Sequence, residues 1–232
     1  DGSGTMSRNK PGAYRAFAKA RRSPRSRRSA AANGVVAGFF DSRFVRLGWK
    51  STEAQVAVST VCLALIRMSR PDQLLLMGVV YAMGIGAAIA RGGTVDPLTA
   101  GLGFGFYLPL AASVHYANEY ADYETDQLTN RTAFSGGSGA LVETNLTRAL
   151  PKQATAATAG LAVLTIGAGV IADRLSLSAV GLLVGIGLFG WGYSLKPIAL
   201  AWRGLGEVDN AVLGGIALPM YGTVVVTGSV AL

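Results

Sequence analysis

Two stretches, QATAATAGLAVLTIGAGVIA at residues 153–172 and LSLSAVGLLVGIGLFGWGYSL at residues 175–195, contain no charged residue. Only Asp173 and Arg174 separate them. A helix rises about 1.5 Å per residue, so each stretch is long enough to cross the roughly 30 Å hydrocarbon core of a bilayer. The short break leaves room only for a tight turn. We therefore expect two antiparallel membrane-spanning helices.

Three further uncharged stretches, residues 73–90, 97–118 and 210–232, have similar lengths. Only 15% of the chain is charged, whereas a soluble domain carries about a quarter. The pattern predicts an all-α, polytopic transmembrane helical bundle over residues 51–232. The apolar run at 54–66 is short for a span and predicts an interfacial or partly inserted helix, in which we expect Cys62 to be buried. One Cys and one His exclude an intrachain disulfide and a zinc cluster built from Cys or His.

The N-terminal arm, residues 1–50, holds 12 of the 21 Lys and Arg residues and two acids, Asp1 and Asp41. It is rich in Arg, Ser and Ala and has no clear period, which is typical of a disordered segment. Such an arm suits either nucleic acid or the anionic surface of a membrane. No aromatic residues interleave with its KARRSPRSRRS run to stack on bases. We therefore expect a cytoplasmic tail near lipid and no nucleic-acid partner.

Basic residues outside the arm predict the orientation, because cytoplasmic loops carry an excess of Lys and Arg. With the N-terminus in the cytoplasm of a multi-pass cell-membrane protein, the loops at 119–152 and 196–209 are also cytoplasmic. Two basic residues, Arg91 and Arg174, then fall outside. Seven fall inside: Arg67, Arg70, Arg131, Arg148, Lys152, Lys196 and Arg203.

The expected second span runs into Asn118-Glu-Tyr-Ala-Asp122-Tyr-Glu-Thr-Asp126, which has the spacing N-x3-D-x3-D. Each step of four residues drifts by only about 40° on a helix, so these three side chains share one face. Oxygen ligands without His or Cys suit Mg²⁺, which phosphate oxygens usually complete. Glu119, one turn before Asp122, is a further candidate ligand. The alternative is a solvated acidic helix end, although acids at membrane depth are costly and usually functional.

Arg131 and a Gly-rich turn, Ser135-Gly-Gly-Ser-Gly139, follow the acidic stretch. An arginine here could pair with phosphate. The turn could present backbone N–H groups to an anion, or it could simply be a flexible connection.

The residues from Asn118 to Asp126 resemble the first Asp-rich motif of the UbiA superfamily of membrane prenyltransferases, in its usual place at the cytoplasmic end of the second span. Arg70-Pro71 before the first span and Tyr193-Ser-Leu-Lys196-Pro197 after the fourth also resemble that family. Tyr193-x-x-Lys196-Pro197 followed by Arg203-Gly-Leu-Gly-Glu207 most resembles the 1,4-dihydroxy-2-naphthoate polyprenyltransferase branch of menaquinone biosynthesis. Many members of that branch depart from a full N-x3-D-x3-D, which this chain retains, so an archaeal-type relative that acts on another acceptor stays open.

The resemblance implies transfer of an isoprenyl group from a polyprenyl diphosphate to an aromatic, quinone-precursor-like acceptor. It implies Mg²⁺ held by Asn118, Asp122 and Asp126. Arg131, Lys196 and Tyr193 are the implied contacts to the diphosphate, and the weaker candidates for substrate binding are Arg70, Arg203 and Glu207.

The chain departs from that family in its number of spans and Asp-rich motifs. The family has about nine spans and a second Asp-rich motif. Only five spans are expected here, and no D-x3-D follows residue 126. We therefore expect a domain truncated at its C-terminus. The competing class is a polytopic membrane transporter with an intramembrane acidic site.

Overall fold

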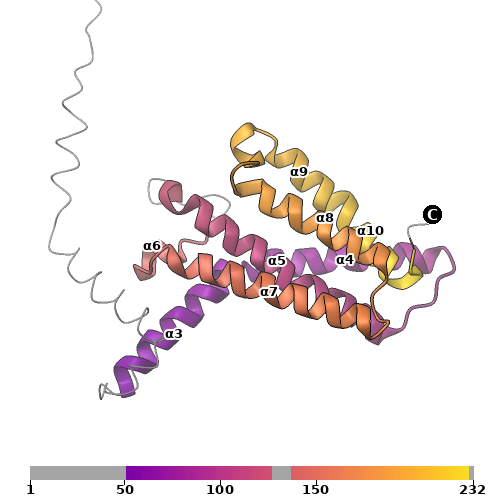
Figure 1. The fold of residues 1–232 in the computed structure, drawn as a ribbon, viewed down its shortest axis with the longest axis horizontal. Helices are drawn as coiled ribbons and strands as arrows, with labels where there is room; N and C mark the ends of the chain where they lie inside the picture. Colours follow the sequence, from indigo (N-terminus) through magenta and orange to yellow (C-terminus); the bar gives the residue numbers. More distant parts are fainter. Residues whose placement is uncertain (1–50, 127–136, 230–232) are drawn as a thin grey trace, which may run out of the picture. The chain divides into compact units, whose positions relative to one another are not determined.

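The computed structural model describes residues 51–126 and 137–229. Its helices are α3 (Ser51–Met68), α4 (Pro71–Ala90), α5 (Pro97–Asp126), α6 (Ala140–Thr144), α7 (Ala149–Ile171), α8 (Leu177–Ser194), the 3₁₀ turn η2 (Leu200–Arg203), α9 (Gly206–Val212), the π turn η3 (Leu213–Ala217) and α10 (Leu218–Thr227) (Figure 1). The described residues contain no strand. The expected disordered arm at residues 1–50 lies outside the described residues.

Five of these helical segments are long and apolar enough to cross a membrane: Pro71–Ala90, Pro97–Asp126, Ala149–Ile171, Leu177–Ser194 and Gly206–Thr227. Each overlaps one of the five uncharged stretches, so the prediction of five spans is confirmed at this level. The last segment is one continuous helix, in which the π turn η3 joins α9 to α10. The chain is therefore an all-helical membrane protein in its described part.

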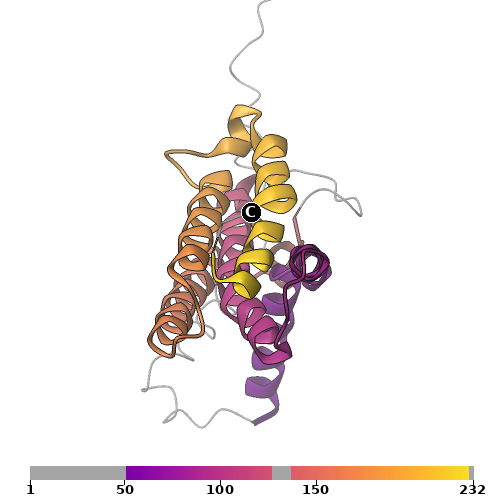
Figure 2. The same ribbon diagram turned by 90° about the vertical axis from the view of Figure 1, so that its right-hand side faces the viewer.

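Residues Val58–Leu232 form one compact unit, and the first unit, Asp1–Ala57, is described only in the opening turns of α3. Within the second unit α7 packs along α5, and α10 packs along α4 (Figures 1 and 2). Helix α8 lies against α5 and also contacts α10. Helices α4 and α10 also contact α5, so all four other spans meet the helix that carries the acidic stretch at its end.

Exposed apolar side chains cover the outer faces of the spans, as a bilayer requires, and Leu75, Ile171 and Leu177 are examples. The expectation that Cys62 is buried was wrong, because its side chain is exposed on α3. The expectation was borrowed from soluble proteins, where an apolar thiol is buried away from water. On a helix beside lipid, an apolar side chain has no need to face the protein interior.

The core between α4, α5 and α10 is aromatic. The Tyr81 and Tyr221 rings lie 5.7 Å apart, and Tyr107 lies 6.4 Å from Tyr221. The hydroxyl of Tyr81 donates to the Ala100 carbonyl (2.8 Å), and that of Tyr221 donates to the Gly103 carbonyl (2.7 Å). These bonds satisfy polar groups that would otherwise be costly in an apolar bundle.

Glycine permits the close approach of α4 and α10. A Cβ on Gly84 would collide with the backbone of Pro219, and one on Gly222 would collide with the Tyr81 carbonyl. Small residues at such contacts let two helix backbones touch in a membrane, where packing rather than water drives association.

This contact predicts a stability difference between two neighbouring glycines of α4. Gly84→Val should lower the free energy of unfolding by about 1–3 kcal/mol, as overpacking does. Gly86→Val is the matched control, because a Cβ at Gly86 meets nothing within 4 Å. Thermal unfolding in detergent measures both. Equal stability of the two variants would contradict the packing of α4 on α10.

Candidate functional site

The acidic stretch lies at the end of α5, the longest helix among the described residues. Helix α5 has 30 residues, so it is about 45 Å long and exceeds the roughly 30 Å hydrocarbon core by several turns. The carboxylates of residues 119–126 belong to these last turns. They can therefore meet water-soluble groups while the earlier turns remain in the bilayer.

Asn118 brings together three elements. In the orientation that satisfies its neighbours, its amide donates to Ser194 Oγ at the end of α8 and to Asp122 Oδ2 (3.2 Å). Its oxygen then accepts from Arg70 Nη2 (3.1 Å), which lies just before α4. Of the candidates named from the sequence, Arg70, Asn118 and Asp122 are therefore neighbours.

Glu119 is the most buried acid of the stretch, with 3% of its surface exposed. Its Oε1 accepts from Arg70 Nη2 (3.2 Å) and from the backbone N–H of Ser138 (2.9 Å), and its Oε2 accepts from the Ser138 hydroxyl (2.8 Å). A buried carboxylate needs such partners, because an unpaired one would pay the full cost of desolvation.

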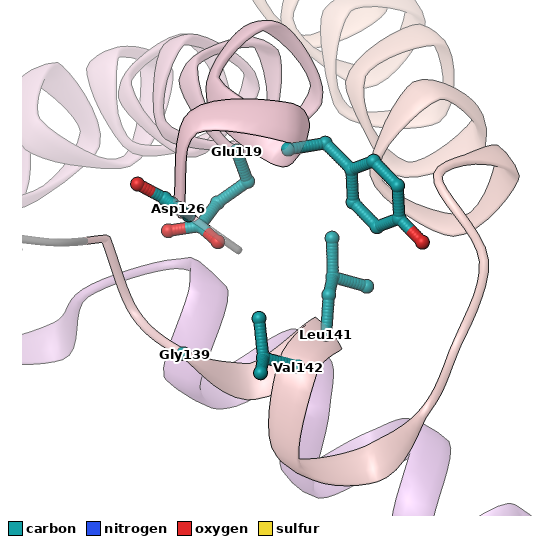
Figure 3. Close-up of a pocket in the computed structure, with 6 residues that line it drawn as sticks. Glu119, Asp126, Gly139, Leu141 and Val142 are labelled. Atoms are coloured by element: carbon teal, nitrogen blue, oxygen red, sulfur yellow. The ribbon is translucent and has the colours of Figure 1, made fainter. Parts of the chain in front are cut away.

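Asp126 lies on the side of α5 that carries Glu119. Seven residues separate the two, which is only about 20° short of two full turns, whereas Asp126 and Asn118 differ by about 80°. Figure 3 shows the two carboxylates together at one wall of a pocket, with Leu141 and Val142 of α6 opposite. Tyr123 and Gly139 complete its lining. The three members of the N-x3-D-x3-D pattern thus spread from Arg70 to this pocket.

A second ion pair, between Arg67 and Glu143, also holds the turn at Ser138 and helix α6 in place. Arg67 contacts Glu143 of α6 through Nη1 (2.6 Å) and Nη2 (3.1 Å), and Nη2 also donates to the Ser138 carbonyl (3.2 Å). The hydrogen bond with Glu143 raises the pKa of Arg67 above its ordinary value. Both side chains are partly exposed, so the pair stabilises the fold by only about 0.2–1 kcal/mol.

The remaining candidates are placed differently. Lys196, Arg203 and Glu207 are exposed, and Arg203 donates to the Pro197 carbonyl (2.8 Å). The Tyr193 ring packs so closely on Gly206 that a Cβ there would lie 2.9 Å from it. In the described part of the chain, none of these four has a hydrogen bond or ion pair to the acidic stretch of α5. Arg131 lies outside the described residues.

The chain was compared with protein families, with curated proteins and with solved structures. None matches.

The described residues contain no group of three or more His, Cys, Asp or Glu side chains that could hold a metal ion alone. Asp122 and Asp126 are nevertheless half-buried carboxylates one turn apart on α5, and Asp122 accepts from the amide of Asn118. Carboxylate and amide oxygens suit Mg²⁺, which usually takes one or two carboxylates and completes its octahedron with water and phosphate. The residues therefore fit Mg²⁺ bound together with a phosphate-bearing ligand.

Two contacts of the site were not foreseen from the sequence. Ser194 belongs to the Tyr193–Pro197 segment, but its hydrogen bond with Asn118 joins positions 76 residues apart. No pattern in the sequence predicts that contact. Glu119 was named only as a further metal ligand, whereas the structure pairs it with Ser138 and Arg70. The Gly-rich turn containing Ser138 was interpreted either as a source of N–H groups for an anion or as a flexible connection, and in the structure the Ser138 N–H donates to Glu119.

Proposed function

We propose that this chain belongs to a membrane prenyltransferase of the UbiA type. The enzyme would transfer an isoprenyl group from a polyprenyl diphosphate to an aromatic, quinone-precursor-like acceptor. The observation that supports it is the convergence of Arg70, Asn118 and Asp122 at the end of a membrane-spanning helix. The Arg70 guanidinium meets the oxygen-bearing side chains of Asn118 and Asp122 there. At the end of a span, the tail of an isoprenoid would enter the bilayer while its diphosphate stays in water.

In this reaction the bond between the allylic carbon and the diphosphate oxygen breaks, and its electron pair leaves with the diphosphate. A ring carbon of the acceptor then bonds to the allylic carbon, and the ring loses one proton to water. Mg²⁺, when bound, would neutralise the leaving diphosphate. Asp122, Asp126 and Asn118 would hold the metal–diphosphate, and Arg70 would add a fixed positive charge where negative charge develops.

The segment after α8 extends this site in the proposal. Ser194 is bonded to Asn118, and Lys196 lies only two residues further on. An exposed ammonium on a flexible stem can reach a bound diphosphate as a point charge. Arg131 is proposed as a further diphosphate contact. Tyr193, Arg203 and Glu207 are proposed to line the approach of the substrates.

The proposed enzyme is a cell-membrane protein with its N-terminus and site on the cytoplasmic side, since the positive-inside pattern places both there. In a Cys62→Ser background, Val142→Cys on α6 should resist a membrane-impermeant thiol reagent in intact cells. Thr94→Cys, which lies in the exposed α4–α5 connection, should react. Labelling of the two variants measures this directly. Labelling at residue 142 and protection at residue 94 would reverse the orientation.

The test of the function itself is product formation. Membranes that contain the full-length protein should convert a labelled isoprenoid diphosphate and an aromatic acceptor into a prenylated, apolar product. Membranes without the protein provide the control. Absence of product across a panel of hydroxylated aromatic acids and naphthoates would contradict the proposal.

A further inference from the structure

Glu119 has little capacity left for a metal ion. Oε1 already accepts two hydrogen bonds and Oε2 accepts one, and the side chain is buried. Coordination would require Glu119 to give up charge-assisted bonds, which are stronger than neutral ones. This carboxylate is therefore already used in bonds within the protein.

The turn that meets Glu119 has a backbone suited to that contact. Gly137 and Gly139 flank Ser138 with φ values of 66° and 65°, a left-handed conformation that glycine adopts without steric cost. A Cβ at Gly137 would also collide with the Asp126 carboxylate. Helix α6 begins directly after this turn and supplies Leu141 and Val142 to the pocket. The hydrogen bonds between Glu119 and Ser138 thus fix residues 138–142, which form the wall of the pocket that faces Asp126.

Arg70 is fixed from the other side of the same carboxylate. Its φ is 51°, an uncommon left-handed conformation for a residue with a side chain and one that costs free energy. Its Nη2 is shared between Glu119 and Asn118 (3.2 and 3.1 Å). Within the described ranges, its Nε and Nη1 donors have no hydrogen-bond partner. These N–H groups remain available to an anion.

We propose that Glu119 is a positioning residue and not a metal ligand: it docks the Ser138–Val142 wall of the pocket on α5 and orients Arg70 beside Asn118. The role in catalysis rests on the proposed prenyl transfer. The docking of the wall does not, and it can be measured without turnover.

Two variants of Glu119 separate the two tasks. Glu119→Ala removes every bond. Glu119→Gln keeps an oxygen for the Ser138 N–H and an NH₂ group for its hydroxyl, but it removes the charge that holds Arg70. The matched control is Glu124→Ala, because Glu124 is an exposed acid of the same helix whose partner is Arg148.

Hydrogen–deuterium exchange of the full-length protein in detergent measures how firmly the Ser138–Val142 wall is docked on α5. Glu119→Ala should accelerate exchange over residues 138–144 by about tenfold or more, the effect of losing bonds to a charged group. Glu119→Gln should stay within about threefold of the parent protein on the same scale, and Glu124→Ala should match the parent protein. Unchanged exchange in Glu119→Ala would overturn the docking, whatever the activity.

Turnover, together with the Mg²⁺ concentration at which it is half-maximal, tests the second task of Glu119, which is to orient Arg70. Glu119→Gln should lower turnover about tenfold through the loss of one charged partner and leave this concentration unchanged, whereas Asp122→Asn should raise it. An equal rise in Glu119→Gln would make Glu119 a ligand and overturn the proposal. Full turnover in Glu119→Gln would overturn the role in orienting Arg70. A parent protein without turnover would reject prenyl transfer, while the exchange experiment would still decide the docking.

Discussion

Asp122→Ala should reduce prenyl transfer by at least about a hundredfold, because the loss of a metal-ligand charge that supports leaving-group departure is worth several kcal/mol. Asp122 is half-buried and receives the Asn118 amide, which in turn contacts Arg70. The substitution therefore removes a charge from the centre of the proposed site. The assay is transfer of a labelled isoprenyl group by membranes with matched amounts of each full-length variant.

Glu124→Ala is the control for that substitution. Glu124 is two residues from Asp122, about 200° around the helix, and its side chain is 81% exposed in a pair with Arg148. Its loss should change activity less than about threefold, as expected for an exposed pair worth under 1 kcal/mol. If α5 ended in interchangeable solvated acids, both variants would show the same mild effect. Equal activities would therefore sink the assignment of the site.

Removal of divalent metal should abolish turnover, and Mg²⁺ should restore it. The donors of the site are carboxylate and amide oxygens, and one His and one Cys in the whole chain leave little alternative chemistry for a softer metal. Purified protein treated with EDTA and then titrated with Mg²⁺ or Zn²⁺ provides the measurement. Recovery with Zn²⁺ but not with Mg²⁺, or turnover that EDTA leaves intact, would contradict this mechanism.

The membrane architecture could be predicted from the sequence because it depends on a single strong constraint. A bilayer demands about 20 apolar residues per helix, and five uncharged stretches meet that demand at the positions of the five long helices. The exposure of the Cys62 side chain could not be predicted in the same way. Which face of an apolar helix meets lipid depends on packing partners, and the composition of the helix does not reveal them.

The candidate site was predicted in part. Helical spacing predicted that Asn118 and Asp122 lie on one face, and they are hydrogen-bonded neighbours. The same rule, applied to seven residues instead of four, places Asp126 near the line of Glu119. The partners from other elements, Ser138 and Ser194, could not be found this way. Their contacts depend on how a turn and a helix end fold back on α5, which local periodicity does not encode.

The most direct test of the central claim follows the two halves of the substrate in one experiment. Full-length protein reconstituted in liposomes receives Mg²⁺, an aromatic acceptor and an isoprenoid diphosphate labelled in both the isoprenyl chain and the diphosphate. Prenyl transfer predicts a prenylated acceptor and free pyrophosphate in equal amounts, both lost with Asp122→Ala. An isoprenoid diphosphate that crosses into the liposomes intact, without any prenylated product, would contradict the account and identify a transporter.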